Sequence, residues 1–171
     1  KSCLAILDEV SEAAAAGKRV ILYFSQDGCP YCKKLLDTNL SLADTVTRTR
    51  EKFEVNAINM WGDREVTGFN GEATTEKEFA RSLKVMFTPT MLFLNEDGNV
   101  VLRLNGYYPP HKFNAALDYA AQHNTDRPRF LDYLATVRSE ERRVGKECRC
   151  GCSREAVVRR GGGWGGGGGG G

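Results

Sequence analysis

Long hydrophobic runs are missing from this sequence of 171 residues. A helix that crosses a membrane needs about 18 to 20 consecutive apolar residues, so we expect no membrane span in this chain. Histidine is also scarce, with two residues in all. This leaves few of the nitrogen ligands that zinc commonly uses. The hydrophobic content of 41% is nevertheless normal for a globular protein, and the length is that of about one domain.

The end of the chain lacks the periodic apolar residues of a folded segment. From Arg138 onward it runs RSEERRVGKECRCGCSREAVVRRGGGWGGGGGGG, a composition that cannot bury a core. The stretch RSEERRVGKEC resembles one translated reading frame of a common sequencing adapter, and an empty signal recorded as G would translate to polyglycine. We therefore predict a folded domain over residues 1–137 and a disordered, non-native tail over 138–171, which we leave out of the fold prediction.

An excess of positive charge disappears once the tail is set aside. The tail holds 8 of the 24 Lys and Arg residues and 4 of the 22 Asp and Glu residues. Residues 1–137 therefore carry 16 basic and 18 acidic groups, a net charge of −2. This part of the chain shows no basic stripe and no RNA-binding motif, so we expect no nucleic-acid partner.

The apolar pattern of residues 1–137 predicts strands that alternate with helices and end in a hairpin and a helix. This order indicates an α/β fold, with a mixed central sheet of about four strands between helix layers and an extra N-terminal helix. The first predicted elements are a helix from Cys3 that Gly17 ends, a strand over 20–24, a helix from Pro30 through Val46 with irregularity near Asn39 and Ser41, and a strand over 53–60. A polar loop over 61–75 follows, with a small hairpin around 69–71, and then a helix that is capped by Thr75 and Glu78 and carries Phe79, Leu83 and Val85. The last elements are strands over 90–95 and 99–104, joined by a turn at Asp97 and Gly98, and helices over 109–123 and 130–137.

Cys29 and Cys32 stand where a strand gives way to a helix, in the stretch ILYFSQDGCPYCKKLL. Pro30 suits the first helical position, which places Cys29 at the helix N-terminus. There the unpaired N–H groups and the positive end of the helix dipole favour an anion, so we expect Cys29 to have a lowered pKa. Cys32, one turn further along, can reach the same sulfur and resolve a mixed disulfide.

Two other interpretations of the cysteine pair compete with disulfide exchange. A zinc site needs about four ligands, and outside the tail only Cys3, His111 and His123 could join the pair. Purely structural cysteines are the second alternative, and the polar QDG turn before the pair indicates a surface position instead of a core one. The C-x-C-x-C at 148–152 has metal-ligand spacing but lies in the predicted tail. We therefore predict disulfide exchange without a metal or another cofactor.

These motifs together resemble the thioredoxin superfamily. CPYC directly follows a strand and opens a helix, and FTPT precedes a hairpin about sixty residues later. More narrowly, QDGCPYCKKL, INMWGDREVT, FTPTMLFLNEDGNVV and LNGYYPPHKF resemble periplasmic thioredoxin-like proteins of the SoxW type. The resemblance covers about residues 3–135. It implies a thioredoxin-like fold, a periplasmic location and thiol-disulfide oxidoreductase activity.

The resemblance also implies roles for individual residues. Cys29 corresponds to the attacking cysteine and Cys32 to the resolving one. Pro89 corresponds to the family's cis-proline, and the edge at Thr88 would pair with an extended substrate segment. Pro30 and Tyr31 complete the predicted substrate-binding residues. Pro89 taken alone is equally compatible with an ordinary proline at the start of a strand.

The chain departs from related families at two positions around the motif. Gly28 and Tyr23 stand where ordinary thioredoxins have a tryptophan and a buried acid, which leaves the proton acceptor for Cys32 undefined. The pair Pro30-Tyr31 matches glutaredoxins. Their glutathione-binding Gly-Gly-Asp stretch is replaced here by LNGYYPP, so we expect no dedicated glutathione partner.

Several large or charged side chains lie near the motifs in sequence. Trp61, Tyr107 and Tyr108 are candidates for the rim of the substrate site, with half-buried packing residues as the alternative. His111 and the pair Lys33-Lys34 are expected on solvated surfaces.

We predict a monomeric reductase of protein disulfides, whose partners are disulfide-bonded substrate proteins and an upstream dithiol electron donor. The alternatives are oxidation or isomerisation by the same residues, and a non-catalytic module that binds peptides along the Thr88 edge. No signal peptide is visible, but the chain begins at Lys1 inside a helical stripe. We therefore expect further residues upstream, and the periplasmic location follows from the resemblance alone.

Overall fold

The computed structural model describes residues 3–122 and 129–139 of the chain. The chain divides into two units, Lys1–Phe130 and Leu131–Gly171. The described part of the second unit, residues 131–139, is helical. This confirms the helix predicted over 130–137 and extends it two residues past the predicted domain end. Most of the predicted tail lies outside the described residues, as do His123 and the three cysteines near the C-terminus.

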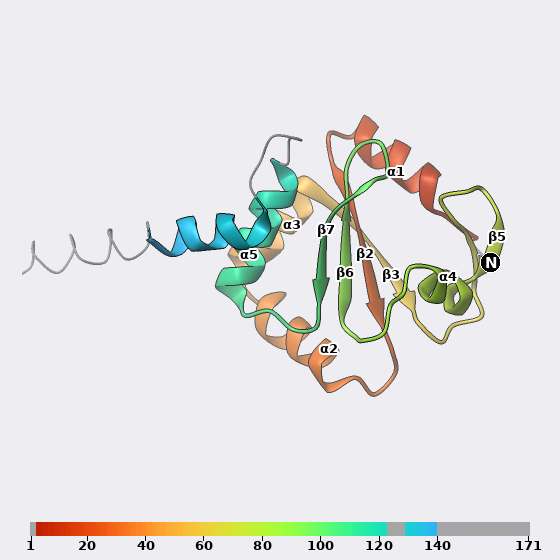
Figure 1. Cartoon of the computed structure of the whole chain (residues 1–171), viewed down its shortest axis with the longest axis horizontal. Coiled ribbons are helices and arrows are strands. Elements are labelled where there is room, and N and C mark those ends of the chain that lie inside the picture. The colour runs from red at the N-terminus through yellow and green to blue at the C-terminus, as the bar shows by residue number, and fades with distance from the viewer. Residues whose placement is uncertain (1–2, 123–128, 140–171) are drawn as a thin grey trace, which may run out of the picture. The chain divides into compact units, whose positions relative to one another are not determined.

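Strands and helices alternate along the first unit (Figure 1). In chain order the elements are β1 (Leu4–Ala5), α1 (Ile6–Ala15), β2 (Arg19–Ser25), α2 (Pro30–Lys34), the π-helical turn η1 (Leu35–Asn39), α3 (Ala43–Lys52), β3 (Phe53–Asn59), β4 (Glu65–Thr67), β5 (Ala73–Thr75), α4 (Glu76–Ser82), β6 (Thr90–Leu94), β7 (Val100–Asn105) and α5 (Pro110–Ala121).

A mixed sheet of four strands in the order β3-β2-β6-β7 forms the centre of this unit. Strand β2 runs parallel to β3, while β6 is antiparallel to both β2 and β7. Interior strands are covered on both faces, which explains why VILYF and TMLFL are continuous apolar runs and not alternating ones. The predicted α/β fold and the four-stranded sheet are therefore confirmed.

The two faces of the sheet pack against different helices. Val20, Leu22 and Phe24 of β2 share one core with buried residues of α1 and α4. Side chains alternate along a strand, so Ile21 and Tyr23 point to the opposite face. Figure 1 shows α1 and α4 on one side of the sheet and α2, α3 and α5 on the other. The cysteine-bearing helix and Tyr23 thus belong to the same side.

The prediction for the first residues was wrong in one respect. Residues 4 and 5 form strand β1 instead of the first helical turn, and β1 joins β4 and β5 in a second, three-stranded sheet. Cys3 therefore lies outside the helical stripe. It is exposed, with its Sγ 3.6 Å from Oγ1 of Thr67. The hairpin predicted around residues 69–71 is confirmed as the connection from β4 to β5.

The helix predicted from Pro30 through Val46 is divided into three pieces. After α2 the chain widens into η1, breaks at residues 40–42 and resumes as α3. Asn39 at the end of η1 is fully buried. Its Nδ2 donates to the backbone oxygen of Tyr108 at 2.8 Å, and its Oδ1 accepts from the Tyr107 hydroxyl at 3.2 Å. A buried amide needs such partners, and the irregularity predicted near Asn39 is confirmed.

Helix α4 begins at the predicted cap. Oγ1 of Thr75 accepts a hydrogen bond from the backbone N–H of Glu78 at 3.3 Å. The helix ends earlier than the apolar pattern predicted, because Lys84 adopts a left-handed conformation with φ of 53°. The N–H of Val85 then bonds back to the oxygen of Ala80 at 3.0 Å, a helix C-terminus of the Schellman type.

Candidate active site

The cysteine pair lies in the turn between β2 and α2. Gly28 has a φ of +70°, a left-handed conformation that glycine adopts without strain. Cys29 follows as the N-cap of α2, and Pro30 occupies the first helical turn. Cys29 and Cys32 are joined by a disulfide, with their Cα atoms 5.3 Å apart. The local sequence DGCPYC therefore brings both sulfurs to the start of the helix.

Two hydrogen-bond donors point at the sulfur of Cys29. The backbone N–H of Cys32 donates to this Sγ at 3.1 Å, and the hydroxyl of Thr88 donates at 3.2 Å. Both cysteines are largely buried, with 8% and 6% of their surface exposed. Donors aimed at a poorly solvated sulfur favour its thiolate over its thiol.

The loop that supplies Thr88 comes from a distant part of the chain. The peptide bond between Thr88 and Pro89 is cis. Pro89 is buried, and its oxygen accepts from the N–H of Gly106 at 2.7 Å. In the described part of the chain, the backbone N–H and C=O of Thr88 make no hydrogen bond. The loop therefore presents unpaired backbone groups beside the sulfur of Cys29.

An open pocket of about 450 Å³ lies in front of the cysteines. Pro30 lines it together with both cysteines. Tyr31 does not line this pocket and is 58% exposed. The pocket is lined by Tyr23, Ser25, Gln26, Asp27, Gly28, Cys29, Pro30, Cys32, Lys33 and Leu36.

Tyr23 is the residue of this pocket with an unusual environment. Its hydroxyl is buried and has no hydrogen-bond partner among the described residues. Burial raises the pKa of Tyr23 above the ordinary value of a phenol. The hydroxyl therefore stays protonated at neutral pH.

The three aromatic candidates differ in their surroundings. Trp61 is 61% exposed, and its Nε1 donates to Oε1 of Gln26 at 2.8 Å, which ties the loop after β3 to the turn before Cys29. Tyr107 is a packing residue, since its hydroxyl bonds to Asn39 and its ring lies 4.7 Å from Nζ of Lys34. Tyr108 is half-buried and contributes its carbonyl oxygen to the same side chain.

The predicted surface residues behave differently from one another. Lys33 is exposed and lines the pocket beside the cysteines. Lys34 is also exposed but lies over the ring of Tyr107. His111 is exposed at the start of α5.

Two exposed apolar residues directly before Thr88 were not among the predicted site residues. Met86 and Phe87 are 73% and 69% exposed. The sequence feature that could have identified them is a pair of apolar residues between a predicted helix and a predicted strand, which belongs to the apolar pattern of neither element. Exposed apolar groups that cluster beside a reactive centre mark an interaction surface.

Within residues 3–122 and 129–139, no three His, Cys, Asp or Glu side chains come close enough to hold a metal ion. In the same ranges no helix is both long and apolar enough to cross a membrane.

A disulfide-bonded C-x-x-C at the start of a helix, directly after the interior strand β2 of this mixed sheet, defines a thioredoxin-fold thiol-disulfide oxidoreductase. The chain belongs to the family of thioredoxin-like domains, whose model matches residues 7–121. The predicted membership of the thioredoxin superfamily is confirmed.

Solved structures show the same fold. A thioredoxin-fold protein from Helicobacter pylori has a TM-score of 0.59 and 22% identity, over 72% of this chain and 81% of its own. A thioredoxin from Thermus thermophilus has a TM-score of 0.53 and 25% identity, over 71% of this chain and 89% of its own. A DsbH oxidoreductase has a TM-score of 0.50 and 13% identity, over 72% of this chain and 85% of its own. No curated protein matches the sequence.

Proposed function

We propose that this protein is a monomeric reductase of protein disulfides that acts in the periplasm. The observation that carries the chemistry is the sulfur of Cys29, which caps α2 and receives hydrogen bonds from the N–H of Cys32 and the hydroxyl of Thr88. The direction and the location rest on the sequence resemblance to periplasmic thioredoxin-like proteins of the SoxW type.

The first step is attack by Cys29 in the reduced protein. Its thiolate displaces one sulfur of a substrate disulfide, so the substrate S–S bond breaks and a mixed disulfide forms. The displaced substrate sulfur leaves as a thiolate and takes a proton from solvent. The N–H of Cys32 and the Thr88 hydroxyl hold the attacking thiolate in place until this exchange.

The second step releases the product through Cys32. Its thiol loses a proton, and the resulting thiolate attacks the Cys29 sulfur of the mixed disulfide. The Cys29–Cys32 disulfide forms and the second substrate thiol is released. The substrate thus gains two electrons and two protons. An upstream dithiol donor returns the same number to the protein and restores the reduced pair.

The substrate segment binds along the loop that precedes β6. The unpaired backbone groups of Thr88 can add an extended segment by strand-like hydrogen bonding. Pro89 holds the end of this loop through its bond from Gly106. Pro30 and the exposed ring of Tyr31 contact the substrate from the helix side.

Reduction of insulin in the presence of dithiothreitol tests this function. We expect Cys29→Ser to abolish the activity, because the remaining Cys32 lacks the two hydrogen-bond donors that point at the sulfur of Cys29. We expect Cys32→Ser to trap a mixed disulfide with substrate, which migrates as a covalent complex on a non-reducing gel and is released by dithiothreitol. If only Cys29→Ser traps a mixed disulfide, Cys32 is the attacking cysteine and Cys29 the resolving one. Full activity in both variants would refute disulfide exchange.

Two alternatives give different results in related experiments. An oxidase or isomerase would introduce or reshuffle disulfides in reduced, unfolded ribonuclease faster than it reduces insulin. A non-catalytic peptide-binding module would bind peptides equally well with and without its cysteines. Analytical ultracentrifugation tests the proposed monomeric state.

A further inference from the structure

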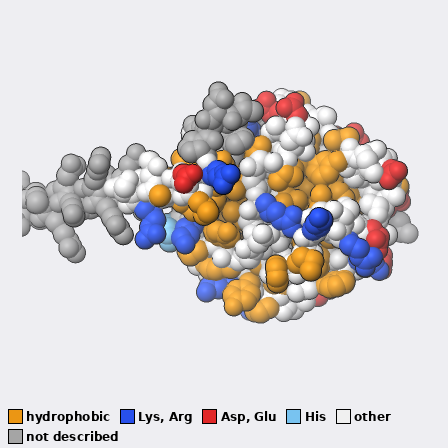
Figure 2. Space-filling view, in the orientation of Figure 1, with side chains coloured by type: hydrophobic (Ala, Val, Ile, Leu, Met, Phe, Trp, Pro, Cys, Tyr) orange, Lys and Arg blue, Asp and Glu red, His pale blue; other side chains and the backbone are white. Residues whose placement is uncertain are grey.

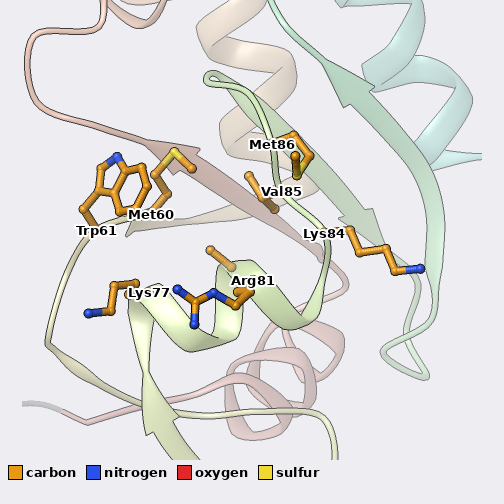
Figure 3. A pocket seen from close by; sticks show the side chains of 8 residues that line it. Met60, Trp61, Lys77, Arg81, Lys84, Val85 and Met86 are labelled. Carbon is orange, nitrogen blue, oxygen red and sulfur yellow. The ribbon is translucent and has the colours of Figure 1, made fainter.

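A second pocket is lined in part by the segment that leads to Thr88. It has a volume of about 240 Å³, and its lining comes from the loop after β3, from α4 and from the segment between α4 and β6. Figure 3 shows Trp61 and Met60 on one side, Val85 and Met86 across from them, and Lys77 and Arg81 on the helix below. The pocket thus combines apolar walls with basic groups from α4.

The Trp61 side of this pocket is fixed by a buried carboxylate. Glu76 is buried and forms an ion pair with Arg64, with 2.7 Å between Oε1 and Nη2. The same oxygen accepts from the backbone N–H of Asn59 at 3.3 Å, and the N–H of Trp61 donates to Oδ1 of Asn59 at 3.0 Å. The N–H of Lys77 donates to the oxygen of Gly62 at 3.0 Å. These bonds hold the loop after β3 against the start of α4.

The opposite side is fixed at the C-terminus of α4. The guanidinium of Arg103 on β7 donates to the backbone oxygens of Leu83 and Lys84, each at 2.7 Å. Together with the bond from Val85 to Ala80, these contacts lock the backbone that leads to Met86. A pocket with walls held in this way needs little reorganisation when a side chain enters it.

The pocket is connected to the candidate active site on both sides. Trp61 donates to Gln26, three residues before Cys29. Met86 precedes Thr88 by two residues, and the Thr88 hydroxyl touches the sulfur of Cys29. The exposed residues Met86 and Phe87 therefore lie in the chain between the pocket and the residue that contacts the sulfur.

The pocket is lined by three basic residues, Lys77, Arg81 and Lys84, of which Arg81 is paired with Glu78. Among the described residues, neither Lys77 nor Lys84 has an ion-pair partner. Arg81 bonds to Glu78 through Nη1 alone, at 3.0 and 3.3 Å, which leaves Nε and Nη2 available. Figure 2 shows Lys and Arg side chains among hydrophobic ones on this face of the molecule, with Asp and Glu side chains beside them toward the right edge. Such a surface is complementary to an apolar residue flanked by carboxylates.

We propose that this pocket is a docking site for the protein substrate. It takes one large aliphatic or aromatic side chain near the reducible disulfide, while Lys77 and Arg81 bind acidic side chains next to it. Its volume suits one side chain and is below that of most small-molecule sites. The inference rests on the proposed function and adds a substrate class to it: disulfides in apolar, acidic segments.

Short peptides that carry a disulfide-linked reporter test the docking site. Three peptides differ only in the flank of the cysteine, which is Glu-Leu-Glu, Lys-Leu-Lys or Glu-Ala-Glu. With wild-type protein and dithiothreitol we expect kcat/KM to be about tenfold higher for Glu-Leu-Glu than for Lys-Leu-Lys, and the difference to shrink at high salt. We expect Trp61→Ala to remove most of the preference for Glu-Leu-Glu over Glu-Ala-Glu.

The double variant Lys77→Glu/Arg81→Glu should invert the charge preference. Its matched control is Arg50→Glu, an exposed residue on α3, which should keep the wild-type preference. If the double reversal unfolds the protein, Lys77→Gln/Arg81→Gln should abolish the preference without inverting it. An unchanged preference in the folded double variant, or an equal change in the Arg50 control, would overturn the docking site.

A small uncharged disulfide separates this inference from the proposed function. Reduction of 2-hydroxyethyl disulfide needs the cysteine pair but offers no flank to the pocket. If the protein reduces it but treats all three peptides alike, the docking site is wrong and the reductase stands. If the protein reduces neither this compound nor any peptide, the proposed function itself fails.

Discussion

Thr88 is the residue whose removal tests the site most directly, because its hydroxyl is the side-chain donor to the sulfur of Cys29. Valine has nearly the same shape as threonine and lacks the hydroxyl. We consider Thr88→Val in a Cys32→Ser background, in which the backbone N–H at position 32 remains and Cys29 is left to titrate alone.

The expected size of the effect follows from the geometry. A hydrogen bond to a charged group contributes about 1.5 to 3 kcal/mol, and the half-buried position of Thr88 places it at the lower end. A loss of about 1.4 kcal/mol shifts the balance between thiolate and thiol about tenfold toward the thiol. A thiolate that is more basic by this amount is also about threefold more nucleophilic.

Because of these two effects, Thr88→Val should react more slowly than the parent protein at low pH and faster at high pH. Below the ionisation midpoint of Cys29 in both proteins, Thr88→Val should react about threefold more slowly with 2-hydroxyethyl disulfide. Above both midpoints it should react about threefold faster. Formation of the mixed disulfide on the Cys29 peptide, followed by mass spectrometry across a pH series, measures this without interference from other cysteines.

The matched control is Thr90→Val. The hydroxyl of Thr90 is buried and donates to the oxygen of Phe87 at 2.6 Å, so its loss affects stability but removes no donor from the sulfur. An unchanged ionisation of Cys29 in Thr88→Val would show that the Thr88 hydroxyl does not stabilise the thiolate. An equal shift in Thr90→Val would show that the effect does not come from the bond to the sulfur.

Three further predictions concern other parts of the chain. Tyr23→Phe should change insulin reduction at pH 7 little, because burial raises the pKa of a hydroxyl that is already protonated there; a hundredfold loss of turnover would show that the hydroxyl takes part. Gly62→Ala should lower stability by about 1 to 3 kcal/mol, since a Cβ would overlap the buried Glu76 carboxylate; chemical denaturation measures this, and an unchanged midpoint contradicts it. Removal of residues 138–171 should leave the melting temperature and the activity unchanged; a loss of several degrees would show that this segment packs.

The order of the main elements and the position of the cysteine pair could be predicted from local sequence patterns. Strand β2, the start of α2 at Pro30 and the turn between β6 and β7 depend on apolar runs, proline geometry and an Asp-Gly pair. All of these act over a few residues. Cys29 at a helix start is a local consequence of DGCPYC, so spacing alone could predict it.

What surrounds the sulfur, and which strand β1 pairs with, depend on contacts between distant segments. Thr88 reaches Cys29 from 59 residues away, and Trp61 reaches Gln26 from 35. Strand β1 exists because β4, about sixty residues later, offers an edge, which overrides the helical pattern at residues 4 and 5. The free energy of such contacts depends on the packing of the whole sheet and its helices, and local propensity carries no information about which distant segment arrives.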